Sequence, residues 1–62
     1  MVKKFKAGDV CTILYRNLVS MCEVGDIVII EQDYVGKEVE VRLNSREVVF
    51  MLPGFLQKIG RL

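Results

Sequence analysis

Apolar residues in this chain recur in short runs that alternate with polar positions, a spacing typical of β-strands. The clearest alternation extends from Glu38 to Leu43, where Val39, Val41 and Leu43 are predicted to face the core and the charged residues between them to face water. The run Ile27-Val28-Ile29-Ile30 is apolar throughout, as in a central strand that is covered on both faces. Helical periodicity is almost absent, so we expect an all-β fold.

Residues typical of turns separate these runs and define an order of elements. Five strands are expected, at residues 10–15, 27–30, 38–43, 46–52 and 58–62. Pro53-Gly54 should end the fourth strand, and Phe55-Leu56-Gln57 could form one 3₁₀ turn before the last. This order predicts a five-stranded antiparallel barrel in a single domain of residues 1–62.

The stretch from Arg16 to Val24 is open to three interpretations: a helical turn, an extension of the first strand, or a loop held by its apolar residues. We interpret it as a long loop between the first two strands.

The turns carry residues suited to unusual backbone conformations. Gly8-Asp9 and Gly25-Asp26 each precede an apolar run; the glycine can take a positive φ and the aspartate can bond nearby backbone. Gly36 is expected to supply a positive φ in the turn before residue 38, and Asn44 tolerates left-handed backbone in the turn before residue 46.

The predicted fourth strand is apolar on both faces. Val48, Phe50 and Leu52 share one face, and Val49 and Met51 share the other. The strand is therefore either covered on both sides or presents an apolar patch to a partner.

Composition narrows the class of protein. With 62 residues, of which 52% are hydrophobic, the chain has room for one core and is too apolar for disorder. Residues 1–6 lack the apolar stretch of a signal peptide, and no apolar run reaches the length of a membrane span, so a soluble cytoplasmic protein is expected. Nine basic against eight acidic residues give a net charge of +1, far from the dense positive field of nonspecific nucleic-acid binders.

The candidate chemistry is sparse. The chain has no histidine and no Cys-x-x-Cys spacing, so neither a metal site nor another cofactor is expected. We expect Cys11 and Cys22 to be reduced thiols in the core or on strands. Glu38 and Glu40 share a strand face, which we interpret as a solvated face rather than a catalytic pair, and the protein is not expected to be an enzyme.

A long first loop, two hairpins, a proline-punctuated turn and a short last strand together resemble the Src-homology-3-like small barrel over nearly the whole chain. Ile13-Leu14-Tyr15 resembles the start of the Ala-Leu-Tyr-Asp-Tyr motif of its peptide-binding members, and Leu52-Pro53 resembles their late proline. The chain departs from that motif at Arg16, Asn17 and Leu56, and it has no tryptophan for the central wall of the groove. The resemblance therefore implies the barrel without polyproline recognition of the usual kind.

A second resemblance concerns the KOW motif of ribosomal and transcription-elongation proteins. The segment from Gly25 to Ile30, together with Gly36-Lys37-Glu38, is similar to that motif, although Val39 replaces its second glycine. The loop of residues 31–35 also lacks the lysines that such members turn toward RNA.

Our leading functional hypothesis is an accessory or regulatory protein-interaction module, because a barrel this small cannot bury all of its apolar residues. The candidate contact residues are Leu18, Val19, Met21, Val49, Met51 and Phe55, with Leu56 part of the same surplus. The partner would be another protein or a second copy of the chain.

The alternative hypothesis is weak binding of RNA or DNA through basic and aromatic side chains. Its candidate residues are Lys3, Lys4, Lys6, Tyr15, Arg16 and Tyr34. Acidic residues on the same small surface oppose this hypothesis, and nothing in the sequence indicates a membrane or a small-molecule substrate.

Overall fold

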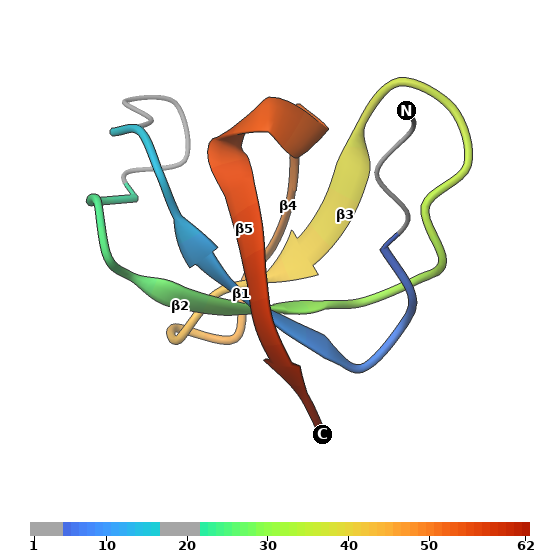
Figure 1. The fold of residues 1–62 in the computed structure, drawn as a ribbon, viewed down its shortest axis with the longest axis horizontal. Coiled ribbons are helices and arrows are strands. Elements are labelled where there is room, and N and C mark those ends of the chain that lie inside the picture. The colour runs from blue at the N-terminus through green and yellow to red at the C-terminus, as the bar shows by residue number, and fades with distance from the viewer. Residues whose placement is uncertain (1–4, 17–21) are drawn as a thin grey trace.

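The computed structural model describes residues 5–16 and 22–62 and is all-β, as predicted (Figure 1). Its elements are β1 (Asp9–Ile13), β2 (Ile27–Ile30), β3 (Val39–Arg42), β4 (Val48–Met51), the 3₁₀ turn η1 (Pro53–Phe55) and β5 (Leu56–Arg61).

The five strands form one antiparallel sheet in the order β4-β3-β2-β1-β5. β2 is the middle strand, as its apolar run predicted, and β1 pairs with both β2 and β5. The order ends at β4 on one side and β5 on the other, so the sheet is not closed. Figure 1 shows it strongly twisted, with β5 passing from η1 toward the C-terminus.

The core is made by the inward residues of these strands. Val39 and Val41 are fully buried, and Leu43 is partly buried against the core. Glu38 and Arg42 are exposed and Glu40 is partly exposed, so β3 alternates as predicted, with Glu40 less open to water than expected. Among the described residues, the buried apolar cluster consists of Phe5, Cys11, Ile13, Cys22, Val28, Ile30, Val39, Val41, Met51 and Leu56.

The ends of the elements differ from expectation by one or two residues. β1 stops at Ile13 rather than Tyr15, and β5 begins at Leu56, directly after the 3₁₀ turn. That turn occupies Pro53–Phe55 instead of residues 55–57, because proline is favourable at the first helical position. Its end is marked by the Leu56 N–H, which donates to the Pro53 carbonyl.

The register of β4 with β3 shows which face of β4 points to the core. Val49 lies opposite Val41 and Met51 opposite Val39, so these two side chains face the core. Met51 is only 2% exposed. The other face carries Val48 and Phe50, which together with Leu52 present an apolar patch to solvent.

The β3–β4 hairpin turns at Asn44-Ser45, as predicted, but the left-handed residue is Arg46, with φ of +73°. The Arg46 N–H donates to the Leu43 carbonyl, and the Leu43 N–H donates to the Glu47 carbonyl. This is a type I turn followed by a one-residue bulge, which requires positive φ at the bulge residue and not at the asparagine.

The segment before β1 lies along the β2–β3 loop, as Figure 1 also shows. The Tyr34 N–H donates to the Phe5 carbonyl at 2.8 Å, and the Ala7 N–H donates to Asp33 Oδ1 at 2.9 Å. The Phe5 and Tyr34 rings meet edge to face at 6.3 Å. The loop is therefore held against the N-terminal segment, which fixes the position of Tyr34.

Candidate functional site

An open groove of about 760 Å³ lies between the β2–β3 loop, the residues after β1 and the 3₁₀ turn. We call it the aromatic groove. It is lined by Tyr15, Tyr34, Gly36, Lys37, Leu52, Pro53, Gly54 and Phe55. Its volume is within the range of small-molecule and peptide sites, about 300–1,000 Å³.

One wall of the groove is fixed by contacts between two distant parts of the chain. The Leu14 N–H donates to the Phe55 carbonyl at 2.7 Å, which ties the end of β1 to the 3₁₀ turn. The Tyr15 ring then meets the Phe55 ring edge to face at 5.9 Å. Tyr15 remains 62% exposed, whereas Phe55 is half-buried against the core. The Tyr15 ring is therefore exposed to solvent and at the same time packed against Phe55.

The groove is mostly apolar, and among the described residues that line it only Lys37 is charged. Beside it, Arg16 is paired with Glu23 at 3.6 Å, and both side chains are about two-thirds exposed (65% and 64%). Since exposed pairs are worth little, Arg16 is available to another anion.

The protein-interaction residues predicted from the sequence are placed differently from the expectation. Met51 is buried in the core, and Val49 and Phe55 are half-buried against it, while Leu56 is fully buried. Leu18, Val19 and Met21 lie outside the described residues. Of this set the groove contains only Phe55, and the exposed apolar surface is formed by other residues.

The nucleic-acid residues are only partly brought together. Tyr15 and Tyr34 line the same groove, and Arg16 adjoins it. Lys6 is exposed next to Asp9, and Lys3 and Lys4 lie outside the described residues. Lys37, Leu52 and Pro53 were not among the site candidates. Two sequence signals pointed to this groove: the late proline and first tyrosine of the Src-homology-3 resemblance, and the pair Tyr15 and Tyr34 of the nucleic-acid alternative.

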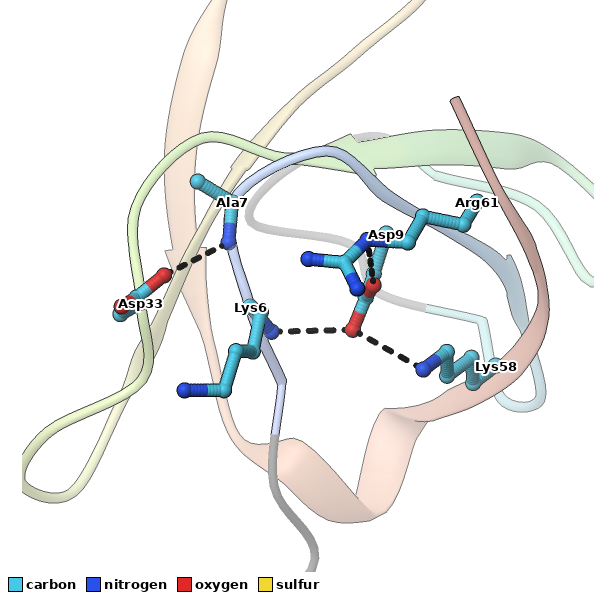
Figure 2. A network of polar contacts seen from close by, with 6 residues as sticks. All are labelled: Lys6, Ala7, Asp9, Asp33, Lys58 and Arg61. Carbon is cyan, nitrogen blue, oxygen red and sulfur yellow. Dashed lines mark hydrogen bonds and ion pairs between the residues drawn. The ribbon is translucent and has the colours of Figure 1, made fainter.

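Apart from the aromatic groove, a cluster of polar side chains surrounds Asp9, which is 0% exposed (Figure 2). Its Oδ2 accepts a hydrogen bond from the Lys6 backbone N–H at 2.9 Å and lies 3.5 Å from Lys58 Nζ. Its Oδ1 makes no hydrogen bond and lies 3.5 Å from Arg61 Nε. Figure 2 shows Lys58 and Arg61, both from β5, each reaching a different oxygen of the carboxylate.

The electrostatics of this cluster favour the ionised carboxylate. The Lys6 N–H holds the pKa of Asp9 below its usual value, against the opposing effect of burial, and the charges of Lys58 and Arg61 lower it further. Lys58 and Arg61 are themselves about half exposed (50% and 59%), so Asp9 is covered by a thin layer of flexible side chains. The cluster thus joins β5 to β1 and to the turn before it.

Both cysteines lie in the core, where Cys11 is 0% and Cys22 is 3% exposed. Burial raises the pKa of the Cys22 thiol, and the nearby charge of Asp26 adds to this effect. Such a thiol has little reactive thiolate at neutral pH.

Within residues 5–16 and 22–62, no helix has the length and apolar character needed to cross a membrane. In the same residues no three or more cysteine, aspartate or glutamate side chains gather as they would around a metal ion. Comparison of the chain with protein-family models, with curated proteins and with solved structures finds no match in any of the three.

Proposed function

We propose that this protein is a non-enzymatic interaction module whose aromatic groove binds an extended, apolar segment of another protein. The observation that carries the proposal is the exposed Tyr15 ring, held against Phe55 in an open apolar groove. Tyrosine is enriched at binding hot spots because it combines a large apolar surface with a polar end.

The charge at the groove suggests the chemistry of the partner. Among the described residues that line the groove, Lys37 is the only charged one, and it is basic. We therefore expect the bound segment to carry an acidic residue beside its apolar positions. Polyproline ligands of the usual Src-homology-3 type carry basic residues and are disfavoured by the same argument.

The fold supports this location for a site. The order of the strands, the long connection after β1 and the 3₁₀ turn before the last strand are consistent with a Src-homology-3-like barrel. In this proposal, Tyr15 and Pro53 correspond to the first tyrosine and the late proline of the motif that the sequence resembles.

The test is a selection from a displayed library of random peptides, followed by titration of each selected peptide into isotope-labelled protein. Amide shifts should cluster on Tyr15, Lys37, Gly54 and Phe55, and the selected peptides should share apolar residues next to an aspartate or glutamate. Shifts that cluster elsewhere, or a selection that enriches no peptide, would refute the proposal.

Exposed substitutions separate binding from folding. Tyr15→Ala removes the projecting ring and should weaken peptide binding about tenfold or more. Lys37→Glu should weaken acidic peptides selectively. Val35→Ala is the matched control, because Val35 is 84% exposed and does not line the groove.

Nucleic-acid binding is the second candidate, favoured by the presence of Tyr15, Tyr34 and Lys37 in one groove. Bases stack on tyrosines, and lysines bind phosphates. Titration with short RNA and DNA at low and high salt distinguishes the two functions. Nucleic-acid binding should weaken steeply as salt rises, whereas a peptide held by apolar contacts and a single contact with Lys37 should weaken only slightly.

A further inference from the structure

The two edges of the sheet differ in how they are protected. β5 contains Lys58, Gly60 and Arg61, and a register shift against β1 leaves Ile59 without an opposite residue. Charges and bulges of this kind discourage a further strand from pairing. β4, at the other edge, is Val48-Val49-Phe50-Met51 and pairs with β3 in unbroken register. Within the strand there is no charge, glycine or proline.

The register also shows which backbone groups of β4 point outward. The Glu31 N–H donates to the Glu40 carbonyl, so the backbone groups of Glu40 face β2 and not β4. Phe50 lies opposite Glu40, and its own N–H and C=O therefore point to the free edge. By the same alternation, the backbone N–H and C=O of Val48 also point outward, whereas the backbone groups of Val49 and Met51 bond to β3.

This edge is complementary to a second copy of itself. Two antiparallel β4 strands related by a two-fold axis at Val49 place each Val48 opposite the Phe50 of the other copy. The outward N–H and C=O groups then pair with each other, and each Val48 side chain packs beside a Phe50 ring. Val48 is 43% and Phe50 is 58% exposed, so both have apolar surface to bury. The net charge of +1 adds almost no repulsion between copies.

We propose that this chain self-associates through β4, forming a two-fold dimer in which the two sheets are continuous. The occupant is a second copy because the edge is symmetric about Val49 and carries no charge that would select a different strand. The interface is small, so the dimer should be weak and in equilibrium with the monomer.

Sedimentation velocity from about 10 µM to about 1 mM should show a reversible shift from monomer toward dimer, in the range of a weak interface. Phe50→Lys places two lysines in the interface and should weaken the dimer about tenfold or more. Val35→Lys introduces the same residue at an exposed loop position and should leave the dimer intact. Neither side chain lines the aromatic groove, so peptide binding should survive in both variants.

Amide hydrogen exchange of the unmodified protein gives an independent readout. Exchange at Val48 and Phe50 should slow as concentration rises, while exchange at Val49 and Met51, already bonded to β3, should change far less. If the protein is still a monomer at about 1 mM, the proposal is wrong, and a strand of another protein becomes the candidate partner of β4. A dimer that Phe50→Lys does not weaken, or protection at residues outside β4, would overturn it as well.

Discussion

Asp9 and Asp26 occupy the same position in two copies of one turn. Each carboxylate accepts from the backbone N–H three residues before it, Lys6 at 2.9 Å and Glu23 at 3.0 Å. Each aspartate N–H donates back to the carbonyl of that same residue, and the preceding glycine has a φ of +91° or +92°. A type II turn needs that positive φ at its third residue, which explains the repeated Gly-Asp pair. The copies differ in burial: Asp9 is covered by β5, and Asp26 is exposed.

The Asp9 charge should stabilise the fold near neutral pH. Asp9→Asn is expected to lower the free energy of unfolding by about 1–3 kcal/mol, because it removes the charge that pairs with Lys58 and Arg61 and strengthens the hydrogen bond from the Lys6 backbone N–H. The pKa of Asp9 is lowered in the folded state, so its contribution is complete above the unfolded-state pKa of about 3.9 and is lost as pH falls through the folded value.

Urea unfolding from about pH 7 to about pH 3 checks this linkage. The difference between the unmodified protein and Asp9→Asn should be constant near neutral pH and should shrink below about pH 4. Asp26→Asn is the control, since it changes the equivalent aspartate, which has no ion pair among the described residues. A difference that persists unchanged to the lowest pH would mean that the effect does not come from the charge.

Arg46→Gly should stabilise the β3–β4 hairpin. Left-handed backbone costs a non-glycine residue about 1–2 kcal/mol, and glycine avoids this at some cost in unfolded-state entropy. The expected net gain in the free energy of unfolding is about 0.5–1 kcal/mol. Arg46→Ala removes the same side chain but keeps the strained φ, so it should show no gain in the same denaturation experiment.

Val41→Ala should cost about 1–3 kcal/mol of unfolding free energy, because Val41 is fully buried at the centre of β3 and its truncation leaves a cavity. Val35→Ala changes the same residue type at an 84% exposed position and should cost less than about 0.5 kcal/mol. Equal midpoints for Val41→Ala and the unmodified protein in a thermal melt would contradict the placement of Val41.

The core cysteines should react slowly with alkylating reagents. Cys22 is protected by burial and by its raised thiol pKa, and Cys11 by complete burial. Mass spectrometry of native protein incubated with iodoacetamide at neutral pH should show little modification, whereas protein in denaturant should be modified quickly. Fast modification of the native protein would show that this part of the core opens readily.

The strands could be predicted because their side-chain pattern reflects burial directly. Val39 and Val41 alternate with charged residues, so the inward face of β3 was readable, and Gly36 takes the positive φ expected, +104°. β4 offered no such contrast, since both of its faces are apolar. Only the pairing with β3 decides that Met51 is inside and Phe50 outside.

The candidate site was harder to predict because its parts meet only in the folded chain. Tyr15 and Leu52-Pro53 carried a motif resemblance, and Tyr34 was a stacking candidate, but no local signal placed the loop of Lys37 beside Leu52-Pro53. Likewise, Asp9 was expected to bond nearby backbone, which it does, whereas Lys58 and Arg61 reach it from the other end of the sequence. Such contacts depend on topology and are not encoded in local spacing.

The pairing of β1 with β5 should limit the folding rate of this protein. The β3–β4 hairpin closes over a few residues and can form within microseconds. Joining Ile13 to Leu56 instead closes a loop of roughly forty residues before any contact between these strands repays the lost chain entropy. The hairpin should therefore nucleate early, the β1–β5 ladder should form late, and folding should take milliseconds or longer despite the small size of the chain.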